Sequence, residues 1–353
     1  MSAVVDTIWV AGADGQRRLL FWQDGVVAEI WHEAVAGRIG TIHNARINRV
    51  FADQGRATGQ LDDGTAISVR VGMRDRLRAG DVVRITIVGA PRDGKAWQAT
   101  IGARLVSPYF VFLPDKTGLF TSKAISAEPS AAIMTALGTQ LTSLGGGAIM
   151  RRMALGVDLP DLQADLATLA ALWAAPACDG DRQFTPDAAC GLVHDAGGLL
   201  ALAVRHTPNS IVHDAPGDDD FAAAYDQAVA AATEVAVGLP SGGVVWIERT
   251  HALTAIDLDS GTGSLAALMQ EAPAVIARHL RLRSLTGLIA IDVPRASLAV
   301  ARRFTADLEQ AFLRDPRMPE ILGRSRGGLL ECRIAHGQPP LADSLQSDHD
   351  RTP

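Results

Sequence analysis

Two short runs, T-A-I-D-L-D-S-G at residues 254–261 and G-L-I-A-I-D-V at residues 287–293, place aspartates at the end of apolar, strand-like segments. Alternate side chains of a strand share a face, so Asp257 and Asp259 are expected to point to one side and the apolar residues between them to the other. A carboxylate at the tip of a buried strand is costly unless positive charge meets it. Divalent metals are common partners of converging carboxylates, so the runs predict that Asp257, Asp259 and Asp292 meet at one cation.

The flanking segments indicate an open α/β sheet. L-P-S-G-G-V-V-W-I-E-R-T at residues 239–250 reads as a turn and a strand, which is close enough to the first run to pair with it as a hairpin. A helix is expected over 264–282, between the two runs, and strand–helix–strand units of open α/β sheets bind ligands at the carboxyl ends of the strands. A helix over 295–313 and a strand over 328–334 follow.

The three acids also have a simpler interpretation. Carboxylates at the ends of strands often cap turns or pair with arginines. The arginines that this interpretation would use are Arg281, Arg283 and Arg326. The residues alone leave both interpretations open.

A basic region precedes this part of the chain. Residues 36–105 contain 12 Lys and Arg and 6 Asp and Glu, a net charge of +6 in a chain of net charge −6, so the remainder carries −12. Short strands separated by Gly and Asp turns are typical of a small barrel, and basic charge with a few aromatics fits an OB-type barrel that binds a polyanion. The candidate stacking residues are Phe51 and Trp97. The alternatives are an aromatic that belongs to the core and a solvated arginine-rich surface without a partner.

Composition excludes several classes of protein. With 353 residues, 48% hydrophobic and 20% charged, the chain is an ordinary globular protein of two or more domains. No apolar run reaches 18 residues, so no membrane span is expected, and the N-terminus lacks the pattern of a secretory signal. The cysteines, Cys178, Cys190 and Cys332, are isolated, which favours a reducing, cytoplasmic location without a disulfide framework or a cysteine zinc site.

Several strings, in their order and spacing, resemble the ribonuclease E/G family. The resemblance is dense at residues 239–261, at I-A-R-H-L-R-L-R-S-L-T-G-L-I-A-I-D (276–292) and at S-R-G-G-L-L-E-C-R (325–333), which are similar to the catalytic region of the family. Upstream, A-G-R-I-G-T-I-H-N-A-R-I-N-R-V-F-A-D-Q-G (36–55) resembles the start of its OB-type RNA-binding domain, and G-A-I-M-R-R-M-A-L-G (147–156) resembles its 5′-end sensor.

The resemblance implies an α/β (α+β multidomain) fold, in which an OB-type β-barrel is inserted into an RNase H-like and DNase I-like catalytic body. The domains expected on this basis are an RNase H-like subdomain made of 1–35 and 179–238, an OB-fold RNA-binding domain at 36–105, a 5′-end sensor-like region at 106–178, a DNase I-like catalytic subdomain at 239–343 and a disordered tail at 344–353.

The resemblance also implies an activity, a metal-dependent endoribonuclease that cleaves single-stranded RNA in RNA processing or decay. Asp257 and Asp292 match the metal-binding aspartates, for Mg²⁺ or alternatively Mn²⁺, and Asp259 stands where the family has an asparagine that supports the site. The implied RNA-binding residues are Phe51, Arg46 and Arg49 on the barrel and, at a 5′-monophosphate, Arg151 and Arg152, the latter in the position of a threonine.

The sequence departs from the family pattern at several positions. The S-G-T-G-S-L turn after Asp259 lacks the usual basic residue, Asp292 is followed by V-P-R-A without the common further acid, and Gln60 replaces a second barrel aromatic. The sequence also lacks the C-x-x-C zinc link of some members, so a homo-oligomer is expected to form without it. Two other hypotheses therefore stay open: a non-catalytic RNA-binding protein with a degenerate nuclease site, and a metal-dependent enzyme acting on a small phosphoester.

Overall fold

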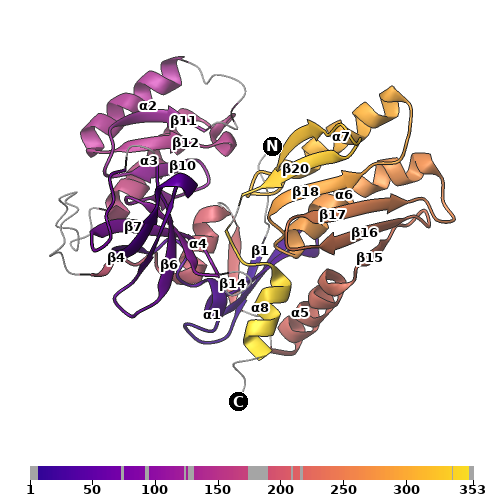
Figure 1. The fold of residues 1–353 in the computed structure, drawn as a ribbon. Coiled ribbons are helices and arrows are strands. Elements are labelled where there is room, and N and C mark those ends of the chain that lie inside the picture. The colour runs from indigo at the N-terminus through magenta and orange to yellow at the C-terminus, as the bar shows by residue number, and fades with distance from the viewer. Residues whose placement is uncertain are drawn as a thin grey trace. The chain divides into compact units, whose positions relative to one another are not determined.

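The computed structural model describes residues 7–72, 75–91, 95–122, 125, 131–173, 190–207, 210–214, 218–335 and 337–349 (Figure 1). The chain divides into two compact units. The first unit comprises Met1–Val35 and Asn209–Pro353, and the second unit comprises Ala36–Pro208. Both units mix helices and strands, which confirms the predicted α/β class.

The second unit contains a closed barrel. Its strands follow one another in the order β4-β5-β6-β8-β7, and β7 pairs back onto β4. Alternate residues such as Ile47, Ile67 and Ile85 fill the interior, and Trp97 packs against this core. The predicted OB-type barrel is thereby confirmed. The strands are β4 (Ile42–Phe51), β5 (Arg56–Gln60), β6 (Ala66–Arg70), β7 (Val82–Gly89) and β8 (Trp97–Ile101), with β13 (Gly191–His194) paired to the outer side of β4.

A small sheet completes the second unit. It has the order β11-β12-β10-β9, and its core joins Phe110 and Phe112 to leucines of two helices, α2 and α3. The elements are β9 (Leu105–Val106), β10 (Phe110–Leu113), β11 (Gly118–Thr121), β12 (Gly147–Met150), α2 (Ala131–Leu144), α3 (Leu159–Trp173), α4 (Gly198–His206) and two 3₁₀ turns, η1 (Ala52–Gln54) and η2 (Arg152–Ala154).

The first unit begins with a four-stranded sheet in the order β14-β1-β2-β3. Because β14 pairs in parallel with β1, the N-terminal strand joins a segment that follows the whole second unit in sequence. Leu20, Val27 and Ile30 of this sheet share a buried cluster with Phe221 and Leu282. The elements are β1 (Thr7–Ala11), β2 (Arg18–Gln23), β3 (Val26–His32), α1 (Glu33–Ala36), β14 (Ile211–Asp214) and α5 (Asp218–Thr233).

The larger sheet of the first unit has the order β15-β16-β17-β18-β20-β19. β17 and β18 run parallel because helix α6 crosses between them, and the other neighbouring strands are antiparallel. The predicted hairpin and strand–helix–strand unit are both present. The elements are β15 (Ala236–Gly238), β16 (Val244–Arg249), β17 (Thr254–Asp259), α6 (Leu265–Leu282), β18 (Gly287–Asp292), α7 (Leu298–Phe312), β19 (Glu320–Arg324) and β20 (Leu330–Ile334).

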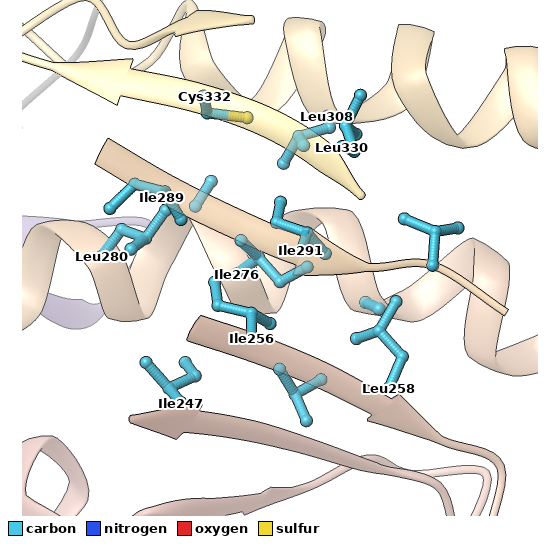
Figure 2. Close-up of a cluster of buried hydrophobic side chains, with 14 of the residues drawn as sticks. Ile247, Ile256, Leu258, Ile276, Leu280, Ile289, Ile291, Leu308, Leu330 and Cys332 are labelled. Atoms are coloured by element: carbon cyan, nitrogen blue, oxygen red, sulfur yellow. The ribbon is translucent and has the colours of Figure 1, made fainter. Parts of the chain in front are cut away.

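One face of this larger sheet forms the main core of the first unit. Figure 2 shows Ile256 and Ile291 of the sheet facing Ile276 of α6, and Leu308 of α7 contributes to the same buried cluster. Since side chains alternate along a strand, the residues between these apolar ones lie on the opposite face of the sheet. We call that opposite face of β16–β18 the open face, because several of its side chains are exposed.

The C-terminal segment differs from the sequence-based expectation. A helix, α8 (Leu341–His349), covers the position where a disordered tail was expected from Ser344. Leu341 is buried, its backbone N–H donates to the carbonyl of Arg283 at 3.0 Å, and Asp343 pairs with Arg249 at 2.5 Å. These contacts anchor a segment whose polar composition alone indicates a tail. Residues 350–353 lie outside the described residues.

The predicted 179–238 subdomain is divided in the structure. Residues 179–189 lie outside the described part of the chain, β13 belongs to the second unit, and β14 and α5 belong to the first. The finer domain boundaries stay predictions. Within the described ranges, no helix combines the length and the apolar character that crossing a bilayer requires.

Candidate active site

Asp257 and Asp292 lie side by side at the carboxyl ends of two parallel strands. They are Cα partners in the register of β17 and β18, and adjacent strands are about 4.8 Å apart. Both are exposed on the open face, whereas the preceding residues, Ile256 and Ile291, are buried in the core. The structure therefore brings together the two acids that lie 35 positions apart in sequence.

Neither of these two carboxylates has a hydrogen bond or ion pair to another residue in the part of the chain that the structure describes. Two of the arginines considered as their partners are engaged elsewhere. Arg281 donates to Glu29 at 2.9 Å, and Arg283 contacts the imidazole of His279 at 3.2 Å. Two adjacent carboxylates without a cationic partner repel each other, and a cation bound between them would relieve that repulsion.

Asp259 has a different environment. It is exposed, but its Oδ1 accepts a hydrogen bond from the N–H of Gly261 at 2.9 Å, so it caps the turn that follows β17. In the register of the sheet it lies opposite Val244, one row beyond Asp257. The turn-capping interpretation is therefore observed for this acid, and its predicted catalytic role stays a prediction.

The turn after Asp259 packs tightly against a neighbouring turn. A Cβ atom on Gly261 would lie 2.4 Å from the carbonyl oxygen of Gly242, and one on Gly263 would lie 2.4 Å from that of Ser241. Backbone packed this closely admits only glycine at both positions. The close backbone contact thus accounts for the two glycines of the S-G-T-G turn, whereas Thr262 between them is exposed.

A metal at this position would have few protein ligands. Among the described residues, no group of three or more His, Cys, Asp or Glu side chains is arranged to hold a metal ion. Mg²⁺ is commonly held by one or two carboxylates and completes its coordination with waters and substrate phosphate oxygens. The donor set of Asp257 and Asp292, two hard oxygen ligands open to solvent, fits that mode of binding.

On the barrel, Phe51 forms a cationic patch with two arginines. It ends β4, and the Cζ atoms of Arg49 and Arg56 each lie 4.8 Å from its ring centroid. Arg56 is not among the RNA-binding residues expected from the sequence. The signal that could have found it is the A-D-Q-G turn, which folds β5 back so that Arg56 becomes the Cα partner of Phe51. Arg46 is half-buried, and its Nη1 donates to the carbonyl of Gly80 at 3.2 Å.

The two arginines of the sensor-like region differ in environment. Arg151 donates through Nη1 to the carbonyl of Ser107 at 2.6 Å, and the hydroxyl of Ser107 donates to Asp165. Burial lowers the pKa of Arg151 from its ordinary value, and the nearby Asp165 opposes that shift. Arg152 begins η2 and is exposed. Arg151 is therefore held by protein contacts, while Arg152 faces solvent.

Comparisons with known proteins identify relatives over most of the chain. The family model described as "Ribonuclease E/G family" matches residues 213–333, which include β16–β18 and both strand-end aspartates. Ribonuclease G of Salmonella typhimurium is 26% identical over 378 residues, which cover 90% of this chain and 77% of that protein. Ribonuclease E of Escherichia coli is 27% identical over 319 residues, which cover 78% of this chain and 30% of that longer protein. Residues 213–333 thus match the ribonuclease E/G family, and most of the chain is similar to ribonucleases G and E.

Proposed function

We propose that the chain is a metal-dependent endoribonuclease that cleaves single-stranded RNA. The observation that carries the proposal is the register of Asp257 with Asp292: two exposed carboxylates, without a partner among the residues that the structure describes, lie side by side on strands that the family model matches. Relatives named ribonuclease G and ribonuclease E support the class of substrate.

Asp257 and Asp292 would hold the metal, Mg²⁺ or Mn²⁺. A divalent ion there supplies an activated water and stabilises the charge that develops during phosphodiester displacement. The chain itself supplies the orientation: each carboxylate projects from a strand whose neighbouring apolar side chains are locked in the core (Figure 2). Asp259 holds the backbone that leaves β17.

The second unit would supply affinity for RNA. Phe51 with Arg49 and Arg56 offers an aromatic ring and positive charge together, which is the combination that single-stranded nucleic acid binds. Arg151 and Arg152 are the proposed contacts for a 5′-monophosphate, of which Arg152 is the one exposed to solvent. A cytoplasmic location and a homo-oligomer without a zinc link stay predictions.

The decisive experiment follows cleavage of a 5′-monophosphorylated, A/U-rich oligoribonucleotide with and without Mg²⁺. Wild type is expected to cleave only with the metal. Asp257→Asn and Asp292→Asn are each expected to slow cleavage by at least about tenfold, since even outer-sphere partners of a metal contribute that much. Glu309→Gln removes the same charge from an exposed position on α7 and serves as the matched control. Cleavage by both Asn variants at the wild-type rate would refute the mechanism.

One observation favours a second candidate, a non-catalytic RNA-binding protein. The turn after Asp259 carries no basic residue, and the exposed position between its two closely packed glycines is occupied by Thr262. This alternative predicts salt-sensitive RNA binding, no cleavage with any divalent metal and no stabilisation by Mg²⁺ or Mn²⁺. The same oligoribonucleotide, followed by binding as well as by cleavage, separates the two candidates.

A further inference from the structure

Trp246 stands on the open face beside the two strand-end aspartates. It is 42% exposed, while its chain neighbours Val245 and Ile247 are buried. In the register of the sheet Trp246 is the Cα partner of Asp257, which is in turn the partner of Asp292. One aromatic and two carboxylates therefore form a single row across β16, β17 and β18.

The neighbours of this tryptophan in the sheet are mostly small. Its partner on the edge strand β15 is Ala236, and the next row of the same face carries Glu248, Ala255 and Ala290. Within the described residues, the indole makes no ring or cation contact. The alanines are too short to cover the indole, which stays accessible, and Glu248 follows it on the same strand and face.

We propose that Trp246 is a base-stacking residue of the RNA site, which holds one nucleobase of single-stranded RNA on its indole and so presents the adjoining phosphodiester to Asp257 and Asp292. This inference rests on the proposed function. Adjacent strands are about 4.8 Å apart, so Asp257 lies one strand away from Trp246 and Asp292 about 10 Å away, within the reach of one nucleotide.

The chemistry of the row favours a base as the occupant. Without a bound metal the two carboxylates repel the phosphates of RNA, so a contact with another part of the nucleotide is needed for affinity at this position. Every base has a flat π-face, and stacking on an aromatic side chain strengthens binding by roughly five- to a hundredfold per base without sequence preference.

The test is a double-mutant cycle, in which the side chain of Trp246 and single nucleobases of the RNA are removed separately and together. Affinity is measured by fluorescence anisotropy in the Asp257→Asn/Asp292→Asn background, which removes both cleavage and repulsion. The ligands are an oligoribonucleotide and a set of copies that each carry one abasic position. Trp246→Leu is expected to weaken binding of the intact RNA about tenfold, and Trp246→Phe to retain most of the affinity. Leu322→Ala, which shortens another exposed apolar side chain on edge strand β19, is the matched control.

Non-additivity at one position supports the proposal. When the base that stacks on Trp246 is missing, Trp246→Leu should cause no further loss of binding affinity. When a base at another position is missing, the two losses of affinity should add. Losses that add at every position, an unchanged affinity, or a dimer that Trp246→Leu dissociates would each overturn it. If the background protein binds no RNA and the wild type cleaves none, the proposed function itself fails. Circular dichroism of each variant verifies that the fold is intact.

Discussion

The guanidinium of Arg281 donates through Nε to the carboxylate of Glu29 at 2.9 Å, and each side chain is only 3% exposed. This pair joins α6, which carries the core of the larger sheet, to β3 of the smaller one. Glu29 also accepts from the indole N–H of Trp31 at 2.7 Å. A buried ion pair of this kind makes the removal of either partner costly, since the remaining charge stays in a dry environment.

Arg281→Met is therefore expected to lower the free energy of unfolding by about 3–5 kcal/mol, measured by urea denaturation. The matched control is Arg314→Met, which breaks the exposed pair with Asp24 and should cost less than about 1 kcal/mol. The double variant Arg281→Met/Glu29→Leu should recover much of the loss. Equal effects of the two single variants would show that burial does not govern the strength of this pair.

His279 predicts an acid-sensitive stability. Burial, and then the charges of Arg283 and Arg278, lower its pKa from 6.5 to about 3. Between these values the unfolded chain binds a proton that the folded chain does not, so stability falls as the pH drops from about 6.5 towards 3. The contribution of one such group is at most about 1.4 kcal/mol per pH unit.

His279→Gln removes this titration and should flatten the dependence of unfolding free energy on pH in that range. The quantity to compare is the difference in unfolding free energy between variant and wild type, at pH 7 and at pH 5. Other groups titrate equally in both proteins, so their contributions cancel in this difference. A difference that does not change with pH would mean that His279 binds its proton as readily in the folded protein as in the unfolded chain.

Metal binding at Asp257 and Asp292 should be visible without any assay of cleavage. Adding Mg²⁺ or Mn²⁺ at a hundred times its dissociation constant is expected to stabilise the wild type by about 2.7 kcal/mol, measured as a rise in thermal midpoint. Asp257→Asn should abolish most of this rise, and Glu309→Gln on α7 should leave it unchanged. An identical rise in all three proteins would place the metal elsewhere.

The arginine beside Phe51 predicts a change in salt dependence. Arg56→Gln is expected to weaken RNA binding and to reduce the slope of log affinity against log salt by about 0.7, if its guanidinium contacts one phosphate of a single strand. Arg303→Gln on α7, an exposed arginine paired with Asp307, is the control and should not alter the slope. A slope that Arg56→Gln leaves unchanged would assign Arg56 to its contacts within the chain, with Phe51 and with the side chain of Gln54.

The local sequence pattern was enough to predict the secondary-structure elements and the face of the sheet on which the aspartates lie. The alternation in T-A-I-D-L-D predicts that Asp257 and Asp259 share a face, and both are exposed while Ile256 and Leu258 are buried. The repeated short strands of 36–105 predict a barrel, which is closed in the structure. These predictions succeed because the period of a strand and the chemistry of its turns are properties of neighbouring residues.

The sequence by itself therefore determined which residues carry the candidate chemistry. Local sequence patterns identify the strand-end aspartates and the basic strands of the barrel. Only the tertiary structure decided which of them meet. The register of Asp257 with Asp292, the place of Trp246 in the same row and the pairing of Arg281 with Glu29 across 252 positions depend on strand order and helix packing. The two pairings of Asp257 with Asp292 and of Arg281 with Glu29 join segments distant in the chain, and the place of Trp246 depends on the register of a hairpin; no local periodicity encodes these relationships.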